Sequence, residues 1–170
     1  MIGLSEKDIL GIIEEFKLNL LIVNRNSGHS FIVSGNSFHL NAFLLKAREE
    51  GALSAKTLGV SVPYHTGLLK DAATEFSGTV TMAEVRDPEI PVISLLSRHI
   101  ISDAQGAKNE VIRNIFNPLD WFSTQIEMHR AGIRIFTECG PSRALLKNSK
   151  FIPEAGKFVT WSSLVKDGEE

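Results

Sequence analysis

The sequence predicts an α/β protein that opens with an incomplete ferredoxin-like subdomain over residues 1–62. Three observations predict it: helically spaced apolar residues near the start, two apolar strand-like runs separated by turn residues, and a second helical run followed by another strand. This α-β-β-α-β order fits a βαββαβ unit whose first strand is largely missing. Helices and strands then alternate over residues 63–165, and residues 166–170 read as a frayed tail.

Local signals justify each element of the first subdomain. Ser5 and Asp8 fit a capping box at the start of a helix. The turn residues Asn26-Ser27-Gly28 predict that the runs on either side pair as antiparallel strands. The expected elements are a helix over 5–17, strands over 18–24 and 30–34, a helix from Asn36 or Ser37 to Gly51, and a strand over 56–62.

The near absence of the first strand has a physical consequence. A sheet that lacks one strand exposes a hydrogen-bonding edge and leaves part of a helix face uncovered. We therefore expect a partner segment to cover this part of the chain.

The second part of the sequence alternates helical and strand-like segments. Helices are expected over 68–76, 107–116 and 121–131, strands over 91–96, 133–138 and 157–161, and a last helix from Pro141 to Lys147. Pro141 is suited to open that helix, because the first helical position needs no backbone N–H.

The composition excludes several classes of function. The 170 residues carry a formal net charge of −2 and are 43% hydrophobic, which fits one ordinary soluble domain or two small subdomains sharing a core. Because Lys and Arg are scattered, neither nucleic acid nor a membrane surface is an expected partner. The longest apolar run, residues 18–23, is far shorter than the roughly 20 residues of a membrane-spanning helix. With no signal-like start, we expect a cytoplasmic protein.

The sequence gives no sign of a metal site or a bound cofactor. Its single cysteine, Cys139, leaves no internal disulfide and no CxxC motif, and the histidines lack ligand spacing. We expect Cys139 to be a core thiol at the end of an alternating strand rather than a nucleophile.

Four stretches occur in one order along the chain and together resemble one family. They are Ile32-Val33-Ser34-Gly35, Val60-Ser61-Val62-Pro63-Tyr64-His65-Thr66, Asn117-Pro118-Leu119-Asp120-Trp121 and Glu138-Cys139-Gly140-Pro141. The sequence from about Ile2 to Trp161 resembles the malonyl-CoA:acyl carrier protein transacylases and the acyltransferase domains of polyketide synthases. The resemblance implies that residues 63–165 are the C-terminal part of the acyltransferase's α/β hydrolase-like domain.

The resemblance also implies a reaction. In that family a serine in a Gly-His-Ser-x-Gly elbow takes the acyl group from coenzyme A and passes it to the phosphopantetheine thiol of an acyl carrier protein. His65 matches the family's catalytic histidine, the general base that activates the serine. Read without its motif, His65 would be a surface turn residue that follows a strand. The implied substrates are malonyl-CoA, or another acyl-CoA, and a phosphopantetheinylated carrier protein.

The family's nucleophilic serine has no counterpart in this sequence. Gly28-His29-Ser30 resembles the elbow, but Ile32 stands where its second glycine belongs and Ser30 opens a strand. The chain alone is therefore expected to be inactive. Three interpretations remain: part of a split or truncated acyltransferase whose serine lies on another chain or segment, an inactive module that binds a carrier protein or synthase, or an unrelated ferredoxin-like structural protein.

Residues near His65 have further expected roles. The segment at Asn117 and Asp120 resembles the one that orients the family's histidine through a backbone carbonyl. The Asp120 carboxylate could instead reach His65 and favour its imidazolium form, or simply cap the helix that starts at Trp121. Tyr64 occupies a position that is aromatic in malonyl-selective relatives, which favours malonyl over methylmalonyl, although it could equally be plain packing.

Two further sets of residues have expected roles outside the chemistry. Glu138 and Gly140-Pro141 are expected to shape the turn into the last helix. Five basic residues could meet an acidic carrier protein: Arg86, Arg98, Arg113, Arg130 and Lys147. The alternative is that they are ordinary solvated surface residues.

Overall fold

The computed structural model describes residues 1–152 and 156–166. Its α-helices are α1 (Glu6–Glu15), α2 (Ser37–Glu49), α3 (Lys70–Met82), α4 (Ala104–Asn114), α5 (Trp121–Arg130), α6 (Ala144–Ser149) and α7 (Trp161–Lys166), with a short 3₁₀ helix, η1 (Gly67–Leu69). Its strands are β1 (Leu20–Ser27), β2 (Ser30–Gly35), β3 (Val92–Ile93), β4 (Ile100–Ile101), β5 (Leu119–Asp120), β6 (Ile135–Glu138) and β7 (Lys157–Thr160). Four of the five residues of the expected tail, 167–170, lie outside the described residues.

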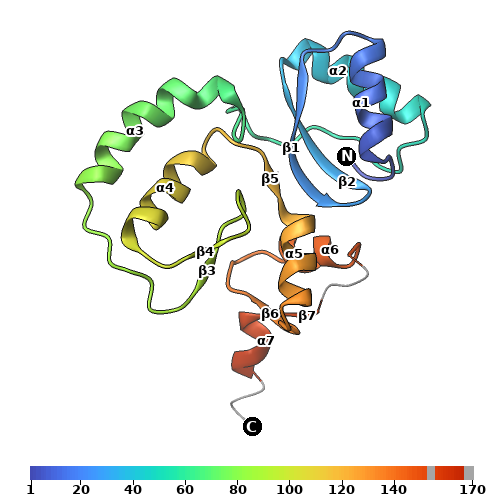
Figure 1. The fold of residues 1–170 in the computed structure, drawn as a ribbon. Helices are drawn as coiled ribbons and strands as arrows, with labels where there is room; N and C mark the ends of the chain where they lie inside the picture. Colours follow the sequence, from blue (N-terminus) through green and yellow to red (C-terminus); the bar gives the residue numbers. More distant parts are fainter. Residues whose placement is uncertain (153–155, 167–170) are drawn as a thin grey trace.

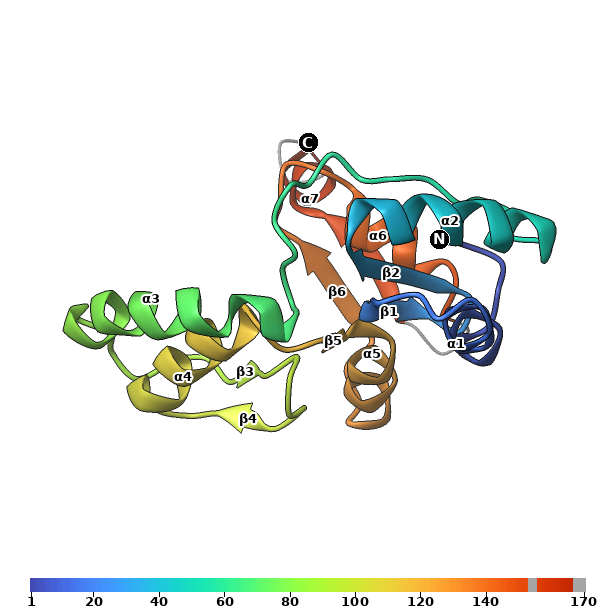
Figure 2. The ribbon, with the colours of Figure 1, turned by 90° about the horizontal axis from the view of Figure 1, so that it is seen from above.

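The elements form three groups in space (Figure 1). The N-terminal unit comprises α1, α2, β1 and β2. The arm comprises α3, β3, β4 and α4, and the C-terminal part runs from α5 to α7. Figures 1 and 2 both show the arm lying to one side of the other two groups. The mixture of helices and strands confirms the predicted α/β class.

The N-terminal unit follows its local sequence signals closely. Ser5 and Asp8 form the predicted capping box, in which the Ser5 backbone N–H donates to Asp8 Oδ2 at 2.9 Å. The strands β1 and β2 pair antiparallel around the two-residue loop Gly28-His29. Buried apolar residues from both helices and both strands form one core: Leu4, Ile9, Ile12, Leu20, Phe31, Phe43, Ala47 and Ala55.

The first and last strands of the ferredoxin-like order are reduced to single residues. Ile2 forms antiparallel bridges with both Ser30 and Ser54. Residue 54 therefore neighbours residue 2, which neighbours β2, which neighbours β1, and this is the spatial order of a βαββαβ unit. A single bridging residue, Ile2, thus stands at the position of the first strand.

The predicted strand over 56–62 is wrong. These residues form neither helix nor strand, and Leu58, Val60 and Val62 are exposed. A strand needs a neighbour that supplies its ladder of hydrogen bonds, and Ile2 offers only one bridging residue. The apolar alternation alone does not make this segment a strand.

A third strand completes the sheet that contains β1. β5 pairs parallel with β1, with Asn24 opposite Leu119 and Arg25 opposite Asp120, which gives the strand order β2-β1-β5. β1 therefore belongs to the N-terminal unit and also pairs with β5, the strand that leads into the C-terminal part.

Helix α5, which contacts β1, carries several buried polar groups. Trp121, Gln125 and His129 recur every four residues along α5 and so share one face. The indole Nε1 of Trp121, both amide atoms of Gln125 and the Nδ1 of His129 are buried, and none has a hydrogen-bond partner among the described residues. This face of α5 therefore lacks the apolar character of the N-terminal core.

The later elements follow the predictions with modest changes. α3 is longer than expected, and α4, α5, β6 and β7 lie close to where they were predicted. β4, β5 and α7 were missed. The predicted helix opening at Pro141 starts at Ala144 instead, because the residues between them form a turn. Among the described residues, no helix is both long and apolar enough to cross a membrane.

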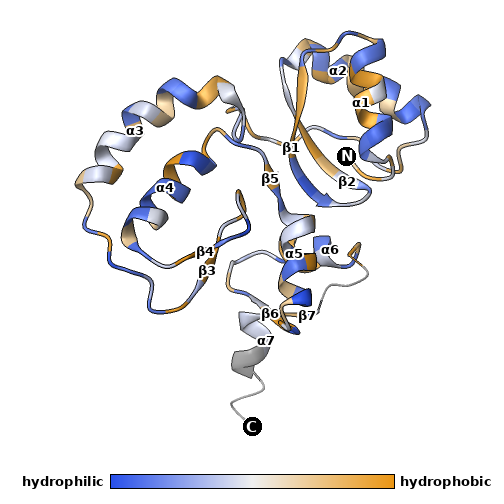
Figure 3. Ribbon diagram, viewed as in Figure 1, coloured by the Kyte–Doolittle hydropathy of each residue, from blue (hydrophilic) through white to orange (hydrophobic). Residues whose placement is uncertain are grey.

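Figure 3 shows hydrophobic residues, in orange, in all three groups. Large apolar side chains are exposed in each group. The most exposed are Leu53, Met82, Phe38, Ile90 and Leu68. β6 and β7 form a two-stranded parallel sheet in which Ile135 is 65% exposed. Parallel sheets are normally covered on both faces, so this one lacks the cover expected for its type.

We predict that Ser5→Ala lowers the free energy of unfolding by about 1 kcal/mol, because it removes the hydroxyl that accepts from the Asp8 amide. Urea denaturation will measure the loss. Ser61→Ala, in an exposed segment without regular structure, is the matched control and should be neutral. Equal losses in both variants would contradict the assignment.

We also predict a pH dependence at this cap. The Ser5 hydroxyl and backbone amide hold the pKa of Asp8 below its usual range. The carboxylate therefore contributes stability above its unfolded-state pKa, and this contribution is lost as the pH falls through the folded-state pKa. The stability difference between the wild-type chain and Asp8→Asn, followed by urea denaturation, should shrink in acid; a constant difference would contradict the prediction.

Candidate active site

His65 lies in a tight turn between the irregular segment 56–62 and η1. Its φ is 63°, in the left-handed region that residues with a Cβ seldom adopt. The backbone N–H of Tyr64 donates to the Val62 carbonyl at 2.9 Å, and the Thr66 hydroxyl donates to the Pro63 carbonyl at 2.7 Å. The residues before and after His65, Tyr64 and Thr66, thus both form hydrogen bonds within this turn.

The carboxyl end of α4 holds His65 at two points. The His65 backbone N–H donates to the Ile115 carbonyl at 2.8 Å, and its Nδ1 lies 2.6 Å from the Asn114 carbonyl oxygen. A carbonyl oxygen can only accept, so this bond requires the proton on Nδ1. In the neutral ring the lone pair then lies on Nε2, the form a general base needs.

The end of a helix explains why carbonyls are free at this position. The last carbonyls of an α-helix have no partner within the helix. α4 ends at Asn114, and His65 satisfies two carbonyls at that end. The sequence predicted orientation by a backbone carbonyl but placed it nearer Asn117. A main-chain acceptor has no side-chain signature, and only the end of the predicted helix could have indicated it.

Asn117 contacts the same helix end. Its side-chain Nδ2 donates to the Arg113 carbonyl at 2.7 Å, and its backbone N–H donates to the same oxygen at 3.1 Å. Asn117 thus donates to the carbonyl of Arg113, the residue before Asn114, whose carbonyl accepts from His65 Nδ1. It lies beside the site and bonds α4 rather than the imidazole.

Asp120 caps α5. Its Oδ1 accepts from the Ser123 backbone N–H at 2.9 Å, and its Oδ2 lies 3.9 Å from Arg25 Nη1. No hydrogen bond or ion pair joins Asp120 to His65 within the described part of the chain. The structure thus has the helix cap that the sequence allowed as the alternative.

Tyr64 lies next to the histidine in space as in sequence. Its ring is half exposed, and the centroids of the two rings are 6.3 Å apart. The Tyr64 ring therefore lies beside the imidazole of His65.

The segment from Glu138 to Pro141 shapes a turn, as predicted. The buried Glu138 carboxylate accepts from the backbone N–H groups of Leu145 and Leu146 at 3.1 and 3.0 Å, and so caps the start of α6. The prediction of a buried Cys139 is wrong: the thiol is exposed. Cys139 follows the last residue of β6, in a small sheet whose cover is incomplete, so nothing packs over it.

The serine that resembled an elbow is a strand residue. Ser30 is buried, starts β2, and pairs with Ser27 and Ile2. A nucleophile elbow joins a strand to a helix and exposes its serine. The geometry at Ser30 therefore agrees with its exclusion.

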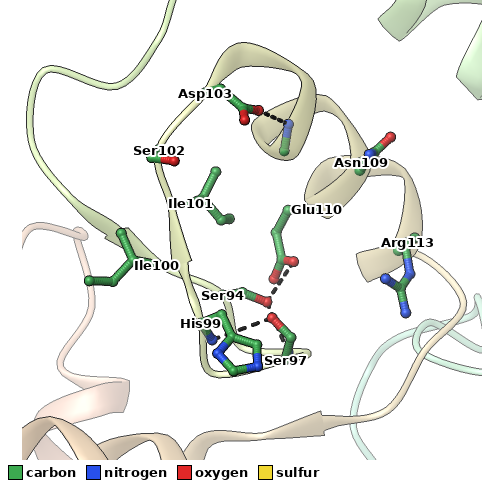
Figure 4. Close-up of a pocket in the computed structure, with 11 residues that line it drawn as sticks. Ser94, Ser97, His99, Ile100, Ile101, Ser102, Asp103, Asn109, Glu110 and Arg113 are labelled. Carbon is green, nitrogen blue, oxygen red and sulfur yellow. Dashed lines mark hydrogen bonds between the residues drawn. The ribbon is translucent and has the colours of Figure 1, made fainter.

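A polar pocket of about 240 Å³ lies between the β3–β4 hairpin and α4 (Figure 4). Glu110 organises it: Oε2 accepts from the Ser94 hydroxyl at 2.7 Å, and Oε1 accepts from the Leu95 backbone N–H at 3.1 Å. Arg113, which also lines the pocket, immediately precedes Asn114, whose carbonyl binds His65. No group of metal-ligating side chains occurs among residues 1–152 and 156–166.

The five basic residues proposed to meet a carrier protein are all exposed, on different elements. Arg98 forms an ion pair with Glu127 at 2.9 Å, which joins the β3–β4 hairpin to α5. The other four are Arg86, Arg113, Arg130 and Lys147.

This chain, an α/β fold in which a helix end holds a histidine, is similar in structure to acyltransferase domains. Solved structures agree on this class. The transacylase from Coxiella burnetii superposes with a TM-score of 0.87 at 29% identity, covering 98% of this chain and 54% of that chain. A polyketide malonyl-transacylase solved with its acyl carrier protein also gives 0.87, at 26% identity over 99% of this chain and 56% of its own.

Curated proteins point to the same relatives. The malonyl CoA-acyl carrier protein transacylase of Bacillus subtilis is 27% identical over 124 residues, which are 73% of this chain and 39% of that protein. The Haemophilus influenzae protein of the same name is 25% identical over 147 residues, 85% of this chain and 47% of its own length. No protein-family model matches. These neighbours identify the malonyl-CoA:acyl carrier protein transacylases as the family this chain resembles, and it spans about half their length or less.

We predict that Asp120→Ala lowers the free energy of unfolding by about 1 kcal/mol through loss of the α5 cap. The imidazole NMR resonances of His65, compared between the wild-type and Asp120→Ala chains at one pH, should stay unchanged. Shifted resonances would show that the Asp120 carboxylate acts on the histidine.

Proposed function

We propose that this chain is the histidine-bearing part of an acyltransferase that moves a malonyl group, or another acyl group, from coenzyme A to an acyl carrier protein. His65 is the general base, and the nucleophilic serine comes from another segment or another chain. The observation that best supports this role of His65 is the 2.6 Å contact between its Nδ1 and the Asn114 carbonyl oxygen. This contact leaves Nε2 as the basic atom.

The chemistry needs one proton acceptor that later becomes a donor. Nε2 of His65 takes the serine proton as the serine oxygen attacks the thioester carbonyl, and the imidazolium then protonates the departing coenzyme A sulfur. The resulting acyl-serine is attacked by the phosphopantetheine thiol. His65 accepts that thiol's proton and returns it to the serine oxygen, so atoms and protons balance over the cycle.

The need for an outside serine is supported by packing as well as by sequence. The printed sequence contains no Gly-x-Ser-x-Gly elbow. The parallel pair β6–β7 and the exposed apolar residues of the arm have the character of surfaces that another layer normally covers. The nucleophile-bearing segment would supply both the serine and this cover.

The substrate and partner come from the relatives. One of them is solved in complex with an acyl carrier protein, and we extend this partner to the present chain. The exposed basic residues provide charge that an acidic carrier would meet. Tyr64 beside His65 supports malonyl over bulkier acyl groups. No resident cofactor is needed.

The direct test joins this chain to a serine-bearing segment. The part of the Bacillus subtilis transacylase that precedes the region matched here is fused ahead of residue 1, and transfer from radiolabelled malonyl-CoA to holo acyl carrier protein is followed. We predict transfer by the fusion and a loss of about 10²–10⁴-fold in kcat for His65→Ala, the usual contribution of a general base.

Controls separate the possible outcomes. His99→Ala, at an exposed histidine of the β3–β4 hairpin, should leave transfer unchanged. Transfer that survives His65→Ala would refute the role of His65. Label on the unfused chain would reveal a nucleophile of its own and return attention to Ser30 and Cys139. A folded fusion that binds the carrier protein but never transfers label would support the alternative, an inactive carrier-binding module.

A further inference from the structure

We propose that Thr66 is a positioning residue for His65 and that its hydroxyl sets the tautomer of the imidazole. This inference rests on the proposed function, since positioning matters only if His65 is the base. Thr66 is 2% exposed, and its hydroxyl donates to the Pro63 carbonyl at 2.7 Å. The bond closes a ring of backbone that contains only Tyr64 and His65 between its ends.

The direction of this hydrogen bond is unusual for a threonine at this position. Thr66 is the N-cap residue of η1, where a threonine side chain commonly accepts from the first amides of the helix. Here it makes no such bond. Its hydroxyl points back across the turn instead, toward the residue before the Tyr64-His65 pair. The Thr66 side chain therefore stabilises the turn and does not cap η1.

The turn needs such support because of the His65 backbone. A φ of 63° is uncommon for a residue with a Cβ, and an extended backbone would relieve it. Relaxation would rotate the side chain and break the contact between Nδ1 and the Asn114 carbonyl. The Thr66–Pro63 bond opposes that relaxation. Because Thr66 is buried, water cannot readily replace the carbonyl as its partner.

The consequence concerns the position of a proton. While the Asn114 carbonyl accepts from Nδ1, the neutral ring carries its proton there and Nε2 is basic. Without the contact the ring is free to place the proton on Nε2, and Nε2 can then no longer accept. Thr66 thus acts through His65 and does not itself touch the reacting atoms.

The first test needs no transferase activity. Long-range ¹H–¹⁵N NMR on the ¹⁵N-labelled chain, at a pH where the imidazole is neutral, reports which ring nitrogen carries the proton. We expect the wild-type His65 to be protonated on Nδ1. Thr66→Val should lower that fraction by at least half, and Thr66→Ser, which retains the hydroxyl, should preserve it.

A matched control and a second variant keep the test decisive. Thr74→Val removes an exposed hydroxyl bonded to the Lys70 carbonyl in α3 and should not change His65. If Thr66→Val does not fold, Thr66→Ala is read in the same way, and the wild-type Thr66 hydroxyl proton should exchange slowly. A folded Thr66→Val or Thr66→Ala chain with His65 still protonated on Nδ1, or a fast-exchanging Thr66 hydroxyl, would overturn the proposal.

Kinetics then separate this proposal from the proposed function. In the fusion described above, Thr66→Val should lower kcat about 10- to 100-fold with little change in KM, because substrate contacts remain while the base is misplaced. Thr66→Ser should restore most of the rate. A fusion that is inactive whatever residue occupies position 66 counts against the proposed function, and the NMR comparison then decides the role of Thr66 alone.

Discussion

The fold depends on a single strand, β1, with neighbours on both edges. It pairs antiparallel with β2 and parallel with β5, and α5 and α6 pack against it. Through β2 it belongs to the apolar core of the N-terminal unit, and through β5 it fixes the start of the C-terminal part. The pairing of β1 with β5 is short, because it has only two residue pairs. The contacts of β1 with β5, α5 and α6 together join the C-terminal part to the N-terminal unit.

The sequence predicted those elements whose causes are local. The capping box of α1 and the hairpin of β1 and β2 are encoded within a few residues, and both formed as expected. The segment 56–62 has the apolar pattern of a strand, but strand formation depends on a neighbour that the pattern does not contain. The two-residue strands β4 and β5 are too short to produce any periodicity. Non-local pairing is what sequence periodicity fails to report.

The candidate site, like the fold, was predicted from sequence only where the causes are local. The motif singled out His65, and the structure supplies what the motif lacks, the main-chain carbonyl of Asn114 that fixes the ring. Asp120 could be foreseen as either a helix cap or a partner of the histidine, because both roles suit a carboxylate at that position; the geometry has the cap. For Cys139 the apolar alternation suggested burial, but burial depends on layers that cover β6.

The double attachment of His65 to the end of α4 has a consequence for how the molecule assembles. The two sides of this contact, residue 65 and residues 114–115, are far apart in the chain, so forming it closes a long loop at an entropic cost. The hairpin of β1 and β2 closes over two residues and bears almost no such cost. Contacts of long sequence separation slow folding. The contact that orients the imidazole of His65 therefore forms at a greater entropic cost than the hairpin.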